Sequence, residues 1–143
     1  YMLQCDFCYM IGPDMFDEFV WPELLATAQK LGRAFYHMDG QGQLAHLNTL
    51  LSSPAVRGIQ WVPGEGAPDV LQWPRVLKTV HANQKLTQFF HNQVNDPFQA
   101  LPRLETQLGS VNHIACMIKA PIQEYHRAVQ LLDRYGIEPE PGI

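Results

Sequence analysis

Two residues whose types and spacing suit chemistry stand at the end of a predicted strand. His37 and Asp39 lie two positions apart, at the end of the apolar run 34–38 and just before Gly40. Residues two apart on a strand share a face, so the imidazole and the carboxylate can both reach one ion or one substrate. The alternative is structural, because aspartate and glycine are ordinary turn residues after a strand.

A second predicted strand, at 58–62, carries Gln60 next to Trp61. Neighbours on a strand point to opposite faces, so we expect Gln60 to face the interior and Trp61 to pack against a helix. The strand is followed by Glu65, which is flanked by glycines with little side-chain bulk. A substrate can approach such a backbone closely, although the same pattern also fits a surface loop.

Two further polar residues complete the predicted substrate-binding set of Gln60, Glu65, Asp6 and His91. His91 follows the predicted strand at 85–90. Asp6 ends the first apolar run, where it can reach a pocket or, equally, cap the helical segment near Pro13.

The three cysteines, Cys5, Cys8 and Cys116, cannot all pair with one another. An odd number of cysteines without a visible signal peptide favours a reducing cytoplasm. Cys5 and Cys8 form a C-x-x-C, but a redox motif needs a helix to begin there and Gly12-Pro13 intervenes. We therefore interpret both as ordinary half-buried thiols.

Apolar runs alternate along the chain with segments of helical periodicity. Strands are predicted at 34–38, 58–62, 85–90 and 112–118, so they recur every 24 to 28 residues. That period is typical of βα units, whose strands are parallel and joined by right-handed crossovers. Residues 3–10 are a candidate fifth strand. Three histidines fall on predicted helices and are expected at the surface: His46, His81 and His126.

Composition limits the class of protein. Hydrophobic residues make up 46% and charged residues 17% of the 143 residues, which is enough apolar material for the core of one domain. A net charge of −4 argues against binding to nucleic acid or to an anionic membrane. No run approaches the roughly 20 apolar residues of a membrane span.

Four or five βα units are too few to close a (β/α)₈ barrel, which takes about 200 residues or more. A doubly wound sheet of this length is the alternative. Its usual signature, a glycine-rich phosphate loop after the first strand, is missing. Periodicity alone leaves both folds open.

Three segments carry a family resemblance: DFCYMIGPDMF at 6–16, YHMDGQGQLAHL at 36–47 and RGIQWVPGEG at 57–66. Together they resemble the C-terminal half of the uroporphyrinogen decarboxylase superfamily, and the likeness covers essentially the whole chain. The resemblance implies an α/β fold, a (β/α)₈ or TIM barrel with parallel strands, of which residues 1–143 form a single partial domain. The N-terminal half of that barrel is then absent from this sequence.

One branch of that superfamily moves methyl groups between corrinoids and thiols with the help of zinc. The resemblance implies His37, Asp39 and Cys116 as the zinc ligands, with His37 and Asp39 also catalytic. Asp39 stands where that branch has a cysteine. Aspartate is a competent zinc ligand, but a site with less sulfur is a different environment for a bound thiolate.

The other branch decarboxylates the acetate arms of a tetrapyrrole and uses no cofactor. In that branch, His37 and Asp39 are expected to contact pyrrole nitrogens or carboxylates. The last strand of the family usually ends in a G-H-G-like turn, whereas this chain has Cys116-Met-Ile-Lys119 there.

The working hypothesis is therefore an enzyme of this superfamily, leaning to zinc-assisted methyl transfer with a corrinoid or other methyl donor as substrate or partner. A tetrapyrrole decarboxylase and a non-catalytic binding fragment are the alternatives. Four or five strands leave two sheet edges open, so we expect either the missing N-terminal half-barrel or a second copy to cover them.

Overall fold

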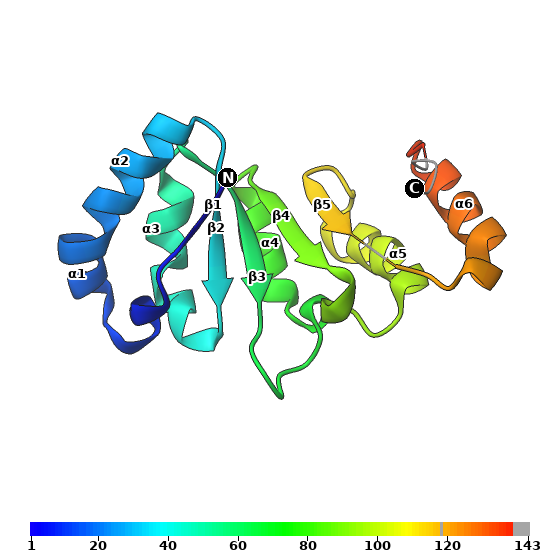
Figure 1. Cartoon of the computed structure of the whole chain (residues 1–143), viewed down its shortest axis with the longest axis horizontal. Coiled ribbons are helices and arrows are strands. Elements are labelled where there is room, and N and C mark those ends of the chain that lie inside the picture. Colours follow the sequence, from blue (N-terminus) through cyan, green and yellow to red (C-terminus); the bar gives the residue numbers. More distant parts are fainter. Residues whose placement is uncertain (118, 139–143) are drawn as a thin grey trace.

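The computed structural model describes residues 1–117 and 119–138, with the side chain of His91 excepted. This part of the chain folds as an α/β unit around a five-stranded parallel sheet, in the order β1-β2-β3-β4-β5 (Figure 1). The strands are β1 (Met2–Gln4), β2 (Ala34–Asp39), β3 (Val56–Val62), β4 (Leu86–Phe90) and β5 (Ile114–Met117).

Helical segments connect each strand to the next. The α-helices are α1 (Pro13–Met15), α2 (Trp21–Leu31), α3 (Leu47–Ser52), α4 (Pro74–Ala82), α5 (Pro97–Leu108) and α6 (Tyr125–Arg134). Shorter segments are the π-helix η2 (Phe16–Val20) and the 3₁₀ helices η1 (Asp6–Met10), η3 (Gln41–His46), η4 (Val70–Gln72), η5 (His91–Gln93) and η6 (Ile122–Glu124).

The ends of α5 show how local sequence sets these elements. The Asp96 carboxylate accepts a hydrogen bond from the Phe98 backbone N–H at 2.9 Å, and Pro97 occupies the first turn, where its missing N–H costs nothing. The helix ends at Gly109, whose φ of +80° is the left-handed conformation that favours glycine. Between these caps, Ala100, Leu101 and Leu104 are buried.

The four strands predicted at 34–38, 58–62, 85–90 and 112–118 are confirmed as parallel neighbours in sequence order. Right-handed crossovers of this length require that arrangement. The fifth strand is shorter than the predicted 3–10, because pairing with β2 stops at Gln4 and residues 6–10 turn into the 3₁₀ helix η1.

The hydrophobic core lies between the sheet and the helices. On β2, Ala34, Tyr36 and Met38 are buried, and on β3 Ile59 and Trp61 are fully buried. Trp61 meets the Trp73 ring edge-on at 5.4 Å, as expected for a side chain that packs against the helical layer. In Figure 1, α3, α4 and α5 lie behind the sheet, on this side.

The opposite face of the sheet carries the alternate residues of each strand, and no helix of the described part covers it (Figure 1). On β2 these residues are Phe35, His37 and Asp39, all less buried than their neighbours. We call this surface the helix-free face. Every strand runs so that its C-terminal end meets the same edge, where η1, η3 and the β3–η4 loop lie.

One prediction about the helices is wrong: His46 is not at the surface but 1% exposed. Residues 41–46 form a 3₁₀ helix, in which side chains three apart align, so His46 points inward with the buried Gln43. The His46 ring stacks on Phe16 at 4.3 Å, and its Nε2 lies 2.8 Å from the Cys8 carbonyl oxygen. Of the other two, His81 is half-buried and His126 is exposed.

No helix in residues 1–117 and 119–138 is both long enough and apolar enough to cross a membrane.

Candidate functional site

His37 and Asp39 lie on the helix-free face, at and near the C-terminal end of β2. The burial pattern along β2 alternates, with Tyr36 and Met38 buried toward the helices and His37 and Asp39 on the other side. His37 is half-buried and Asp39 is exposed. The two predicted catalytic residues therefore share one face, as residues two apart on a strand must.

Gln60 belongs to the same face. It is the register partner of His37 on β3, and the Gln60 side-chain oxygen pairs with His37 Nδ1. Gln60 Nε2 donates in turn to Gln88 Oε1 on β4 at 3.2 Å. At 4% exposure, Gln60 faces the interior as predicted, but it contacts His37 rather than lining a hollow.

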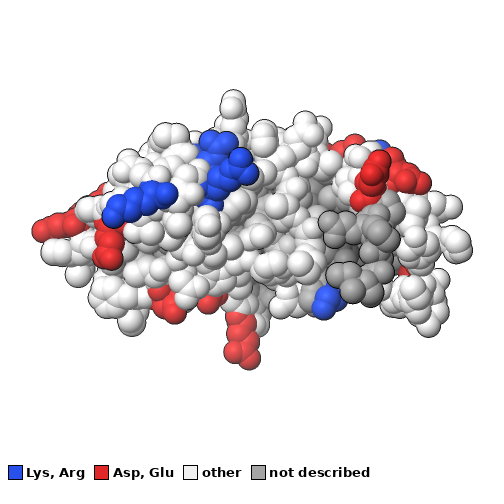
Figure 2. Space-filling view, turned by 45° about the horizontal axis from the view of Figure 1, so that its top comes forward, with Lys and Arg blue, Asp and Glu red and all other residues white. Residues whose placement is uncertain are grey.

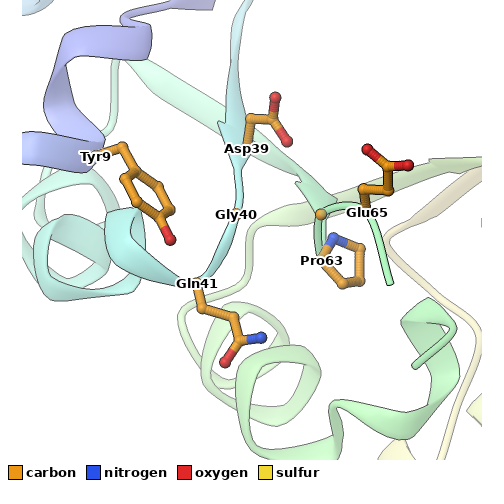
Figure 3. A pocket seen from close by; sticks show the side chains of 7 residues that line it. Tyr9, Asp39, Gly40, Gln41, Pro63 and Glu65 are labelled. Atoms are coloured by element: carbon orange, nitrogen blue, oxygen red, sulfur yellow. The ribbon is translucent and has the colours of Figure 1, made fainter. Parts of the chain in front are cut away.

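A hollow of about 450 Å³ lies at the C-terminal edge of β2 and β3, lined by Tyr9, Asp39, Gly40, Gln41, Pro63, Gly64 and Glu65. We call it the edge pocket. Figure 3 shows the Asp39 and Glu65 carboxylates on one side of the Gly40 backbone and the Tyr9 ring on the other. Two carboxylates and one amide supply acceptors, and no lysine or arginine lines this pocket.

The turn that follows Asp39 depends on two glycines. Gly40 has a φ of +81°, which side chains other than glycine rarely adopt, and its N–H donates to the Val62 carbonyl at 2.8 Å. A Cβ on Gly42 would stand 2.8 Å from the Tyr9 ring. The run Gly40-Gln41-Gly42 thus brings the Tyr9 ring close to the backbone beside Asp39.

Sequence reasoning missed Tyr9, which is 57% exposed in η1. The signal was the spacing of the two glycines after Asp39, since paired glycines mark a backbone that another group approaches closely. Nothing in the sequence says which group that is, because Tyr9 and Gly42 are 33 residues apart.

The remaining predicted substrate-binding residues divide. Glu65 is exposed and lines the edge pocket with Asp39. Asp6 is exposed at the first position of η1 and is not among the residues that line the pocket, so the structure does not bring it to Asp39. His91 begins η5, directly after β4, but its side chain lies outside the described part of the structure.

Cys116 faces away from His37 and Asp39. On β5 it is the register partner of Phe89, which is fully buried on the helical side. It lines a hollow with Phe98 and Leu101 of α5. Burial raises the pKa of the Cys116 thiol, which keeps it protonated. The inferred three-ligand set of His37, Asp39 and Cys116 is therefore corrected, because the sheet separates the thiol from the other two.

These residues do not fit a zinc ion held by all three. In residues 1–117 and 119–138, no group of three or more His, Cys, Asp or Glu side chains is placed to hold a metal ion. A zinc site also needs its thiol ionised, and the burial of Cys116 works against that.

The C-x-x-C thiols lie behind the strand that carries His37. Cys8 is fully buried, not half-buried as predicted, while Cys5 is half-buried. Burial, together with the neighbouring Cys5 thiol, raises the pKa of Cys8 to about 12. Burial also raises the pKa of Tyr36, whose hydroxyl donates to Gln43 Oε1 at 3.0 Å. A thiol held protonated in this way is a poor nucleophile.

Charge is distributed unevenly between the two edges of the sheet. Lys30, Arg33, Arg57 and Lys85 lie at or near the N-terminal ends of β2, β3 and β4, whereas Asp39, Glu65 and Asp69 follow the C-terminal ends. Figure 2 shows a group of Lys and Arg side chains near the top of the view and Asp and Glu side chains projecting from its lower edge. The edge pocket therefore lies on an acidic edge, which favours ligands with positive charge or N–H groups.

Comparison of the chain with protein-family models, with curated proteins and with solved structures finds no match.

Proposed function

We propose that this chain is the C-terminal half of a (β/α)₈ barrel enzyme of the uroporphyrinogen decarboxylase superfamily. The supporting observation is the sheet itself: five parallel strands in unbroken sequence order, with helices packed on one face. A doubly wound sheet reverses its strand order at a switch point and carries helices on both faces. A barrel cut lengthwise has neither feature, and its helix-free face is the former interior.

The proposed site is the C-terminal edge of the strands, where barrel enzymes carry out their chemistry. The observation that supports it is the convergence of Asp39 and Glu65, from two different strands, on one hollow beside His37. The family resemblance of the segments at 36–47 and 57–66 points to the same two strand ends.

Of the two chemistries in the family, we favour the decarboxylase type, with a tetrapyrrole as substrate. The edge pocket offers carboxylate acceptors, which bind the N–H groups of pyrroles, and none of the cations that bind substrate carboxylates. We assign Asp39 and Glu65 to substrate N–H groups and His37 to an adjacent contact. The acidic arms of the substrate then need cationic partners outside this pocket.

Zinc-assisted methyl transfer, in contrast, has less support than the sequence gave it. That chemistry needs a thiolate ligand beside His37 and Asp39, and Cys116 is on the opposite side of the sheet. A corrinoid partner has no recognisable contact among the described residues.

Binding of a stable porphyrin, uroporphyrin, to the chain tests the proposal by quenching of tryptophan fluorescence. Asp39→Asn and Glu65→Gln should each weaken binding by about 10-fold or more, because a hydrogen bond to a charged group contributes roughly 1.5–3 kcal/mol. Glu23→Gln, on the exposed surface of α2, is the matched control and should change nothing.

Zinc analysis of the same purified variants separates the two chemistries. We expect Cys116→Ser to leave both porphyrin binding and metal content unchanged. One zinc per chain that is lost in His37→Ala, Asp39→Ala and Cys116→Ser alike, with no porphyrin binding, would overturn the decarboxylase proposal in favour of methyl transfer.

A further inference from the structure

Four polar side chains form a row across the helix-free face. Gln4, His37, Gln60 and Gln88 are successive register partners on β1, β2, β3 and β4. The row ends at Ala115 on β5. It lies one pleat behind Asp39, on the N-terminal side of the edge pocket. We call it the amide row.

Gln60 is the connected member of this row. At 4% exposure its amide is removed from water, so both its oxygen and its nitrogen need partners within the protein. The nitrogen donates to Gln88 Oε1 at 3.2 Å. The oxygen faces His37 Nδ1. Because an amide oxygen can only accept, the proton in that contact belongs to Nδ1.

We propose that Gln60, oriented by Gln88, is a positioning residue that holds neutral His37 with its proton on Nδ1. A neutral imidazole has one N–H and one lone pair, so this tautomer leaves the lone pair on Nε2. His37 then presents a hydrogen-bond acceptor to the helix-free face and to any ligand bound there. The ligand it selects is one that offers an N–H or O–H donor at this position.

The surroundings of His37 make the amide its main control. The register partners on either side, Gln4 and Gln60, are uncharged. On β4 the residues of this face are Leu86, Gln88 and Phe90, also uncharged. Asp39, two residues along β2, is the one charged group of these strands that shares the face. No neighbouring cation or second carboxylate on these strands therefore competes with Gln60 to set the tautomer.

This inference rests on the proposed function only for the identity of the ligand. If the substrate is a tetrapyrrole, His37 Nε2 is an acceptor for a pyrrole N–H beside those of Asp39 and Glu65. The tautomer itself is a property of the chain without ligand, so it can be tested apart from porphyrin binding.

Nitrogen-15 NMR of histidine-labelled chain measures the tautomer directly, in solution or, for an associated form, in the solid state. The His37 signals are assigned by their loss in His37→Ala. In the unsubstituted chain we expect the Nδ1–H pattern for His37. The exposed His126 in the same spectrum gives the distribution of an unconstrained imidazole.

Substitutions then test the role of each amide. Gln60→Leu should move His37 to the distribution of His126, and the nearly isosteric Gln60→Met should do the same if the leucine variant does not fold. Gln60→Glu keeps an acceptor and should retain the Nδ1–H form. Gln88→Leu frees the Gln60 amide to rotate and should give an intermediate distribution. Gln29→Leu, exposed on α2, is the control.

Two results would overturn the proposal. An Nε2–H pattern in the unsubstituted chain would show that Gln60 donates to His37 instead, with the lone pair on Nδ1. An Nδ1–H pattern that survives Gln60→Leu and Gln60→Met would show that another group sets it. Failure of porphyrin to bind, with the tautomer and its response to Gln60 as expected, would overturn the proposed substrate and leave this inference standing.

Discussion

The Tyr9 ring lies directly against Gly42, so that a Cβ on Gly42 would stand 2.8 Å from Tyr9 Cδ2 and Cε2. This close approach links η1 to η3 and forms one wall of the edge pocket. The two segments are joined here by the absence of a side chain rather than by a hydrogen bond.

Gly42→Ala should therefore displace Tyr9 and destabilise the chain by about 1 kcal/mol, at the low end for an overpacked contact because the ring is half exposed and can move. Beside Tyr9→Ala the same substitution should be neutral or stabilising, since alanine is preferred to glycine in a helical segment. Urea unfolding of the four chains of this double-mutant cycle measures the coupling.

Gly12→Ala is the matched control for this cycle. Gly12 has nothing within 4 Å of a built Cβ and a φ of −77°, so the substitution should not depend on Tyr9. An equal cost of Gly42→Ala in both backgrounds would mean that the Tyr9 contact contributes nothing to the turn after Asp39.

Lys85 stabilises the edge of the sheet opposite the pocket. Its ammonium donates to the carbonyl oxygens of Ser53 and Val56 at 2.6 and 2.7 Å, which ties the end of α3 to the start of β3. Lys85→Met keeps most of the aliphatic stem but leaves two carbonyls without this donor. We expect a loss of about 1–3 kcal/mol in the free energy of unfolding.

Lys78→Met, on an exposed position of α4, is the control and should change the free energy of unfolding by less than about 0.5 kcal/mol. Burial lowers the pKa of Lys85, with a further contribution from the nearby Arg57. If the Lys85 and Lys78 variants unfold at the same urea concentration, the two hydrogen bonds do not stabilise the fold.

The strands and their order were predictable from sequence because hydrophobic period and repeat length are local properties. The faces of His37, Asp39 and Gln60 followed from strand alternation alone. The side on which Cys116 lies required the register of β5 against β4, which pairs it with Phe89. Register between distant strands is a tertiary property, so the inferred third ligand could not be checked before the structure was known.

Burial of His46 was unpredictable for a related reason. Its spacing from the leucines that follow fits an α-helix with His46 on the polar side. The segment instead forms a 3₁₀ helix, and the different period turns His46 inward. The Cys8 carbonyl and the Phe16 ring that receive it come from another part of the chain.

Cys8 should make the fold sensitive to alkali. Its pKa is about 12 in the folded chain against an ordinary value of 9.0, so the thiol ionises first in the unfolded chain. The folded state then holds more protons, and its stability is full below pH 9 and falls as the pH rises from about 9 toward 12. Cys8→Ala should reduce that slope by up to about 1.4 kcal/mol per pH unit.

Urea unfolding at several pH values between 8 and 10.5 measures the slope, and comparing slopes removes the constant cost of the cavity left by Cys8→Ala. Cys5→Ala serves as the thiol control in the same segment. A slope that Cys8→Ala leaves unchanged would show that the Cys8 thiol does not contribute to alkaline destabilisation.

The last prediction concerns association of the chain. The sheet order leaves β1 and β5 as edges, and strand edges with free N–H and C=O groups pair readily with other strands. The helix-free face also carries Phe35, Leu86 and Phe90, each only half-buried in the described structure. In a complete barrel, the other half would cover both features. We therefore expect the isolated chain to form dimers or larger assemblies at micromolar concentration, as measured by sedimentation velocity. Substituting lysine for Leu86, on the helix-free face, should weaken this association, whereas lysine at the exposed Ala82 of α4 should not. A stable, folded monomer at these concentrations would show that the sheet needs no covering half, which would contradict the barrel proposal.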